Sequence, residues 1–472
     1  MLSQQQTNAL LTELDHSMMH DIFGQQTSLT RASTLAHWNA AQLAFLAHGA
    51  TTPDHLAAAL AEAPEFAHAQ AVKGMFYLLL GRRELLGTAQ EALAAATQAA
   101  KDTPVTKREA RYVEALKVWM AGSPQGAIHQ LEQVLVDHPD DTLSMKLGHA
   151  IRFVLGDSTG MLQSVERVMP AYDPKHPGHG YLLGCHAFAL EENGAYERAE
   201  NAGRQALWTA PDDAWGLHAV AHVHDMTANA AKGLDWLEGR EAAWAHCNNF
   251  RYHVWWHKAL MQLDLGQIDE ALALYDQQIR KDHTDDYRDI SNGTALLMRL
   301  ELEGVDVGHR WEEMADISAT RTEDGCLIFA DLHYLLALNG DHRQTDAARL
   351  IQRIRHDGQV GQSETAQRMA HPGTEAALGL EAFSEARFAE AFVHLARARP
   401  TMQLAGGSHA QRDVFERMTI DAGLRAGLLD QAEHILNERQ AQRGGTEDGY
   451  CAGRRDLIAA GRGPFDQHSL PA

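Results

Sequence analysis

Apolar and polar positions follow one another along most of the chain with the three- to four-residue spacing of amphipathic helices. The segment 180–213, GYLLGCHAFALEENGAYERAENAGRQALWTAPDD, shows the clearest pattern. Ala187 and Ala199 occupy positions where two helices would touch, Gly194 occupies a turn, and Pro211 closes the segment. No stretch alternates apolar and polar residues with β-branched enrichment, so no strand is predicted. The pattern therefore predicts a helix–turn–helix unit of ~34 residues.

The same spacing recurs more loosely elsewhere, and it predicts further helix pairs near residues 68–104, 107–141, 251–283, 372–400 and 410–443. Helical periodicity with a weaker motif continues between them, over 141–175, 214–247, 287–322 and 326–358. A unit of ~34 residues with small residues at the helix crossing is the tetratricopeptide repeat pattern. The expected fold is therefore all-α: an α-solenoid of tetratricopeptide-like helix–turn–helix repeats, with about ten or eleven helix pairs.

Three regions are expected within this array. Residues 1–175 form degenerate N-terminal helical repeats, residues 176–360 form central tetratricopeptide-like repeats with His-rich motifs, and residues 361–472 form C-terminal helical repeats and a cap. The expected breaks are the Pro/Gly/His segment 172–180 and the polar stretch 356–373.

Charge and apolar content narrow the range of partners. The 472 residues carry a formal charge of −22, which argues against nucleic acid and against an anionic membrane surface. The first residues lack the basic and apolar regions of a signal peptide, and the densest apolar run, 75–80, is too short to cross a bilayer. The four cysteines are far apart, which fits a reducing compartment. We expect a cytoplasmic protein that binds neither nucleic acid nor membrane, with homo-oligomers through its apolar end faces as an open alternative.

Histidine is unusually frequent, with 28 residues, and two predicted helices each carry a pair at i and i+4. His218 and His222 lie in HAVAHVHDM, and His253 and His257 lie in HVWWHKAL. This spacing places both rings of a pair on one helical face. Neighbouring solenoid helices would then bring the pairs together as ligands for zinc or another divalent ion. Two alternatives are histidines that pack against nearby tryptophans, and a metal-free pocket with histidine as acid or base.

A further candidate is GGSHAQRDVF at residues 406–415. Ser408 followed by Gln411 three residues later matches a capping box at a helix start. The free amides of that helix start, together with Arg412, would suit an anion. The alternative is an ordinary turn and cap.

Five segments, PDDAWGLHAVAHVHDM, HVWWHKAL, ALALYDQQI, MRLELEGVDVGHRW and LAGGSHAQRDVF, occur in this order. Together they resemble the tetratricopeptide repeat protein 38 family, from about residue 180 to the C-terminus. The resemblance implies an atypical tetratricopeptide solenoid with one shared polar pocket rather than a broad peptide groove. The five histidines that match the family's two motifs are His218, His222, His224, His253 and His257. Asp225 stands where the family often has Glu, and His409 stands where some members have Asn.

Tetratricopeptide geometry, which the resemblance implies, turns certain positions of each first helix toward a concave groove. The ligand-binding candidates on this basis, together with the last motif, are Tyr181, Trp215, His218, His222, His253, Trp256, Ser408, Gln411 and Arg412. The expected function is capture of a peptide segment or a small molecule in this His/Trp-lined concave pocket.

The alternative function is a metal-dependent or histidine-based enzyme, a hydrolase or a lyase, centred on the two HxxxH helices. The expected metal ligands are His218, His222, His253 and His257, with zinc as a suitable ion. The catalytic candidates are His222, His224, Asp225 and Arg412, with His224 and Asp225 placed behind the ligands.

Overall fold

The structure, a computed structural model, describes residues 19–462. Over that range the chain is helical, and the only β-type pairings are isolated bridges at His20 with Gln26 and at Gly49 with Cys247. The all-α prediction is therefore confirmed.

Eleven helix pairs follow one another within residues 19–462, in agreement with the repeat count expected from the chain length. Their bounds are α2 (Ala32–Leu46) with α3 (Thr52–Glu62), α4 (Ala67–Leu79) with α5 (Leu86–Asp102), α6 (Lys107–Met120) with α7 (Pro124–Asp137), α8 (Thr142–Leu155) with α9 (Ser158–Val168), α10 (His179–Glu192) with α11 (Tyr196–Thr209), α12 (Ala214–Met226) with α13 (Ala230–Leu237), α15 (Phe250–Asp264) with α16 (Ile268–Leu274), α17 (Tyr287–Leu302) with α18 (Arg310–Ala319), α19 (Ile328–Gly340) with α20 (Gln344–Val360), α22 (Thr374–Ser384) with α23 (Phe388–Ala398), and α24 (His409–Arg425) with α25 (Leu429–Gln442).

Shorter elements connect some pairs, and one more helix follows the last pair. These elements are η1 (Arg83–Leu85), η2 (Met169–Ala171), α14 (Ala242–Ala245), η3 (Tyr275–Ile279), α21 (Glu364–Arg368), η4 (Met369–Gly373), η5 (Arg399–Ala405) and α26 (Gly449–Arg462).

The unit predicted most clearly from sequence, α10 with α11, has the expected construction. Gly194 lies in the turn between the helices with φ of +77°, a left-handed conformation that glycine adopts without steric cost. Ala187 and Ala199 are fully buried where the helices touch. Residues 172–178 form the first expected break. The second break begins later than expected, because α20 continues to Val360.

Small residues let consecutive repeats approach closely in the middle of the chain. A Cβ atom on Gly203 of α11 would lie 2.6 Å from Val220 Cγ2 and 2.8 Å from the carbonyl oxygen of Gly216, both on α12. This proximity leaves room only for glycine at position 203. It holds α12 against both α10 and α11, which fixes how the side chains of α12 face their neighbours.

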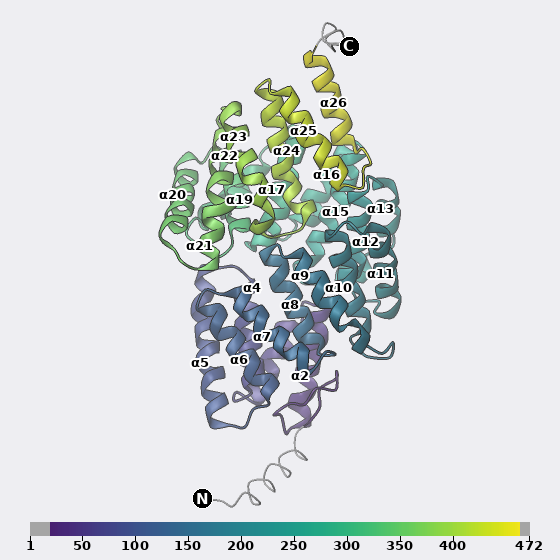
Figure 1. Cartoon of the computed structure of the whole chain (residues 1–472), viewed down its shortest axis with the longest axis vertical. Coiled ribbons are helices and arrows are strands. Elements are labelled where there is room, and N and C mark those ends of the chain that lie inside the picture. Colours follow the sequence, from purple (N-terminus) through teal and green to yellow (C-terminus); the bar gives the residue numbers. More distant parts are fainter. Residues whose placement is uncertain (1–18, 463–472) are drawn as a thin grey trace, which may run out of the picture.

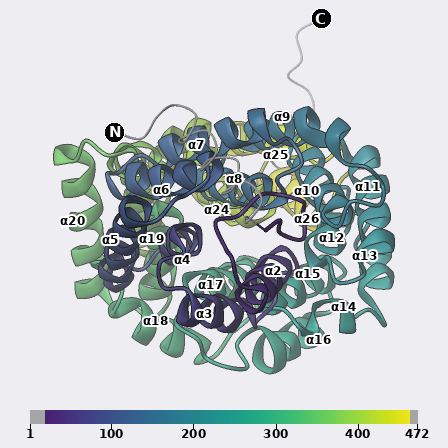
Figure 2. The same cartoon turned by 90° about the horizontal axis from the view of Figure 1, so that it is seen from below.

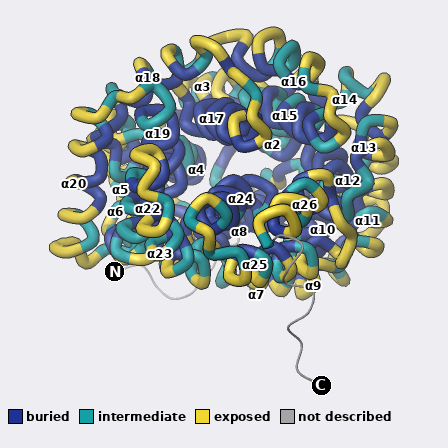
Figure 3. The backbone as a smooth tube through the Cα atoms, turned by 90° about the horizontal axis from the view of Figure 1, so that it is seen from above, coloured by how far each residue is buried: buried dark blue, intermediate teal, exposed yellow. Residues whose placement is uncertain are grey.

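The helix pairs wind into a superhelix that closes on itself. Figure 1 shows the C-terminal helices stacked above the N-terminal ones, and Figure 2 shows the pairs arranged around a common axis. Segments distant in sequence meet inside: α24 contacts α12 and α17, and α2 contacts α8. Figure 3 shows buried residues gathered on the helices that face the middle and exposed residues around the outer rim. The inner helix faces are therefore covered by other parts of the same chain.

Within residues 19–462, no helix combines the length and the apolar character needed to cross a membrane. The N-terminal segment on which the expectation about a signal peptide rests, residues 1–18, lies outside the described residues.

Candidate metal centre

Helices α12 and α15 each carry one of the predicted histidine pairs. The side chain of Asp213 starts α12 by accepting a hydrogen bond from the amide of Gly216 at 3.1 Å. Helices α12 and α15 contact each other because they are the inner helices of successive repeats. The four rings lie in the interior, with exposed fractions of 1% for His218, 0% for His222, 8% for His253 and 0% for His257.

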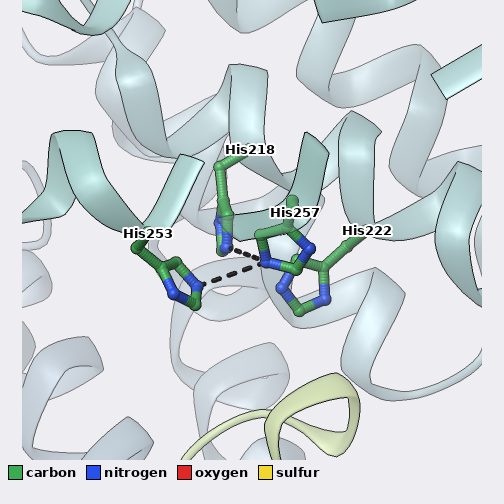
Figure 4. Close-up of side chains that lie close together, drawn as sticks. All are labelled: His218, His222, His253 and His257. Carbon is green, nitrogen blue, oxygen red and sulfur yellow. Dashed lines mark hydrogen bonds between the residues drawn. The ribbon is translucent and has the colours of Figure 1, made fainter. Parts of the chain in front are cut away.

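The two pairs form one cluster. His257 Nε2 lies 3.1 Å from His218 Nε2 and 3.2 Å from His253 Nε2. With His222 included, one ring nitrogen from each histidine lies within 4.8 Å of the others. Figure 4 shows the four rings pointing toward a common point. The sequence-based expectation that the two pairs meet therefore agrees with the geometry.

The spacing of these nitrogens resembles that around a tetrahedral ion. Zinc binds histidine nitrogens at ~2.0–2.1 Å, which places two ligand nitrogens of a tetrahedron ~3.3 Å apart. The two short contacts of His257 are close to that value. These two separations are therefore compatible with nitrogens that bind one ion.

Hydrogen bonding fixes the tautomer of one ring. His253 Nδ1 lies 2.8 Å from Asn292 Oδ1 on α17, so Nδ1 carries the proton and the Nε2 lone pair faces the cluster. The Nδ1 atoms of His218 and His257 are buried without a hydrogen-bond partner among residues 19–462. His257 Nε2 faces the Nε2 atoms of both His218 and His253, and a single proton on His257 Nε2 cannot make a well-aligned hydrogen bond to both. A cation between the rings would bind the Nε2 lone pairs of His218, His253 and His257 together, with the ring protons on the Nδ1 atoms.

Burial keeps three of the four rings, those of His218, His253 and His257, neutral. Because the rings are removed from water, the pKa values of His218 and His257 fall well below the usual value for histidine. Burial also lowers the pKa of His253 to about 3, against the hydrogen bond to Asn292, which favours the charged form. Neutral imidazole is the form that binds metal ions.

Aromatic side chains support the rings from behind. Phe188 stacks on His218 with a centroid separation of 5.6 Å, and Trp256 stacks on His253 at 5.2 Å. Trp215 and Phe250 lie against His218 at centroid distances of 5.1 Å in each case. Packing of histidine against tryptophan, which the sequence left open as an alternative, therefore coexists with the convergence of the ring nitrogens.

Two carboxylates at the end of α10 adjoin the cluster. Glu191 Oε2 lies 3.3 Å from His222 Nδ1, while Glu191 Oε1 accepts a hydrogen bond from His409 Nε2 at 2.6 Å. Although burial lowers the pKa of His409, the charges of Glu191 and Glu192 raise it to about 9. Burial conversely raises the pKa of Glu191, but His409 and His222 together lower it to about 2. Glu191 and His409 thus form a charged pair beside His222.

The start of α24 confirms the predicted capping box. Ser408 Oγ accepts from the amide of Gln411 at 3.1 Å, and Gln411 Oε1 accepts from the amide of Ser408 at 2.9 Å. The anion at this helix start is the protein's own Glu192, which accepts from the amide of His409 at 2.9 Å and lies 3.6 Å from Arg412 Nη2. These capping hydrogen bonds occupy the side chains of Ser408 and Gln411, so the structure does not present them to a ligand as expected.

His224 and Asp225 do not stand behind the histidine ligands. His224 Nε2 lies 3.9 Å from Glu200 on α11, and Asp225 Oδ1 lies 3.1 Å from Arg443 Nη2. Successive residues of a helix point in directions about 100° apart, which turns His224 away from the face of His218 and His222. Asp225, three residues after His222, stays near that face, but its carboxylate pairs with Arg443. The expected position of His224 behind the ligands is therefore wrong, and the carboxylate of Asp225 is engaged by Arg443.

The expected open groove is also absent at the predicted residues. Tyr181, Trp215 and Trp256 are buried, because the closed superhelix covers the inner helix faces with α24 and with residues 22–47. The hydroxyl of Tyr181 donates to Asp212 Oδ1 at 3.0 Å, away from the histidine cluster. The sequence did not single out Asn292, whose only signal was its place on an inner helix one repeat after His253.

No protein-family model matches the chain. One solved structure with a similar helical arrangement is described as the human IFIT1 dimer with m7Gppp-AAAA. It is 14% identical, with a TM-score of 0.34, and the match covers 84% of this chain and 88% of that chain. The TM-score is too low for the match to bear on function. The tetratricopeptide-like solenoid is established by the helix pairs themselves, and the resemblance to the tetratricopeptide repeat protein 38 family stays a prediction.

Proposed function

We propose that this protein binds a divalent transition-metal ion such as zinc at His218, His222, His253 and His257, and that this centre serves a hydrolase- or lyase-type reaction on a small molecule. The observation that carries the proposal is the convergence of four buried imidazoles whose ring nitrogens lie within 4.8 Å of one another. Four histidines are an all-nitrogen set of the kind that zinc, copper and nickel prefer.

The arrangement favours a reactive centre over a purely structural one. Catalytic zinc sites commonly have three protein ligands and one position for water or substrate, while structural sites have four. The Nε2 atoms of His218, His253 and His257 are in close contact, whereas no hydrogen bond ties His222 to them. An ion held by these three, with the His222 position given up to substrate, could polarise a carbonyl or phosphoryl oxygen.

The protein's own residues supply proton handling and access. The Glu191–His409 pair adjoins His222 and can hold or release a proton beside the centre. The side chains of His409 and Arg412 keep exposed fractions of 23% and 13%, so this edge of the cluster reaches solvent. A small polar molecule would approach the centre from this edge. A long peptide would need the aromatic candidates Tyr181, Trp215 and Trp256 at the surface, and they are buried.

The test is zinc uptake by the full chain and its variants. Protein dialysed against zinc at neutral pH, then washed with a weak chelator, is analysed for metal content. His218→Ala and His257→Ala should each retain one zinc fewer per chain than the wild type. His224→Ala is the matched control, because His224 lies on the same helix and faces Glu200 instead. Circular dichroism melting shows whether each variant is folded. A folded wild-type chain that retains no zinc would contradict the proposal.

A further inference from the structure

A second group of potential ligands adjoins the four histidines. One ligand atom from each of Glu191, Glu192, His222 and His409 lies within 4.8 Å of the others. They come from the C-terminal end of α10, from α12, and from the first turn of α24. His222 belongs to both groups, so any ion bound here would share a ligand residue with the proposed metal centre.

Unsatisfied buried atoms point into this second group. Glu191 is completely buried, and its Oε2 atom has no hydrogen-bond partner among residues 19–462. His222 is also completely buried, and neither of its ring nitrogens makes a hydrogen bond within that range. Glu191 Oε2 and His222 Nδ1 are 3.3 Å apart, but their geometry does not meet the requirements of a hydrogen bond. Buried polar atoms left this way cost about 1–3 kcal/mol each, so such atoms call for an explanation.

An internal ion pair explains only part of this arrangement. His409 Nε2 lies 2.6 Å from Glu191 Oε1 and 3.4 Å from Glu192 Oε1. Arg412 Nη2 forms a further ion pair with Glu192 Oε2 at 3.6 Å. Glu191 Oε2 and both nitrogens of His222 remain unpaired in that scheme. A divalent cation in place of the His409 proton would use the unpaired atoms as well as the paired ones.

We propose that Glu191, Glu192 and His409 hold a second divalent cation, joined to the four-histidine centre through the His222 ring. Nδ1 of His222 faces Glu191, and Figure 4 shows its other nitrogen turned toward His257. A ring that binds an ion through each nitrogen is an imidazolate, so binding of the second ion would release the His222 ring proton to solvent. Two carboxylates with imidazole nitrogens form a mixed oxygen and nitrogen set, which suits zinc, manganese or iron. The inference rests on the proposed function, and it makes the centre a two-metal site in which Glu191 and His409 are ligands whenever the second ion is bound and a proton-carrying pair when it is not.

The test is the number of zinc ions per chain in the full-length protein, measured by elemental analysis after zinc loading and a chelator wash. We expect two in the wild type, and one in both Glu192→Gln and His409→Ala. The Glu192→Gln change keeps an oxygen acceptor for the amide at the start of α24. His394→Ala is the matched control, since His394 also pairs with a partly exposed glutamate, Glu375, at 2.8 Å. This control should retain two.

The outcomes separate the two proposals. One zinc per chain in the wild type that persists in Glu192→Gln and is lost in His218→Ala supports the four-histidine centre and overturns the second position. Two zinc ions that persist in both Glu192→Gln and His409→Ala also overturn it, because the second ion then binds elsewhere. No zinc in the wild type overturns both proposals. A wild-type stoichiometry below two overturns the second position even if a variant fails to fold.

Discussion

The hydrogen bond from His253 to Asn292 offers a test of the metal centre that leaves every ligand in place. Asn292 is buried on α17, and its Oδ1 atom lies 2.8 Å from His253 Nδ1. We expect Asn292→Ala to free the His253 ring to rotate and to change tautomer. Loss of a group that orients a metal-bound histidine costs about 10- to 100-fold in metal affinity. This corresponds to about 1.4–2.7 kcal/mol.

The assay is competition for zinc between the protein and a chromophoric chelator at neutral pH. Asn292→Asp is the matched variant, because it keeps an oxygen acceptor for His253 Nδ1 and adds a charge that makes the ring a stronger ligand. It should bind zinc at least as tightly as the wild type, while Asn292→Ala binds more weakly. Equal affinities for wild type and Asn292→Ala, with both folded, would refute the view that Asn292 orients a ligand.

Three further predictions concern the stability of the scaffold. Burial raises the pKa of Asp213 to about 7 from 3.8, so the folded state keeps a proton that the unfolded state releases, and the stability of the wild type falls as pH rises through that window. Asp213→Asn keeps the helix cap and should be more stable than the wild type by up to about 4 kcal/mol above pH 7, but not near pH 4. A stability difference in urea unfolding that does not change with pH would contradict this. Gly203→Ala introduces a Cβ atom 2.6 Å from a packed methyl group and should lower the free energy of unfolding by about 1–3 kcal/mol. Gly453→Ala, in open space on α26, should instead raise it by about 0.5–1 kcal/mol. Similar denaturation midpoints for the two variants would show that the helices are not in tight contact at Gly203. Arg439→Met leaves the buried carboxylates of Asp413 and Asp448 without their shared guanidinium and should lower the free energy of unfolding by about 3–5 kcal/mol. Arg455→Met, at a more exposed ion pair, should lower it by less than about 1 kcal/mol. Equal losses for the two variants in chemical unfolding would contradict this.

The repeat architecture was predictable because it depends on local patterns. The small residues Ala187 and Ala199 and the turn at Gly194 each act within one unit of about 34 residues. The second expected break shows the limit of composition. The stretch from His356 onward is polar, yet α20 continues to Val360 as the last part of a helix whose inner face is held by buried Leu350.

The histidine cluster was predictable for a related reason. The i and i+4 spacing fixes each pair on one helix face, and consecutive inner helices of a solenoid place those faces side by side. The contacts of His409 were not predictable in this way. His409 meets Glu191 across 218 positions of sequence, because many small rotations between repeats accumulate until α24 enters the middle of the superhelix. The same closure buries Trp215 and Trp256, which repeat geometry alone places on an open groove.

The central claim is that the four histidines bind a metal ion. The most direct test is anomalous diffraction at the zinc edge from crystals of the full chain grown with zinc. We predict a strong peak within coordination distance of the Nε2 atoms of His218, His253 and His257, and its disappearance in crystals of His257→Ala. An ordered histidine cluster with no anomalous peak between the rings, in crystals that contain zinc, would contradict the claim.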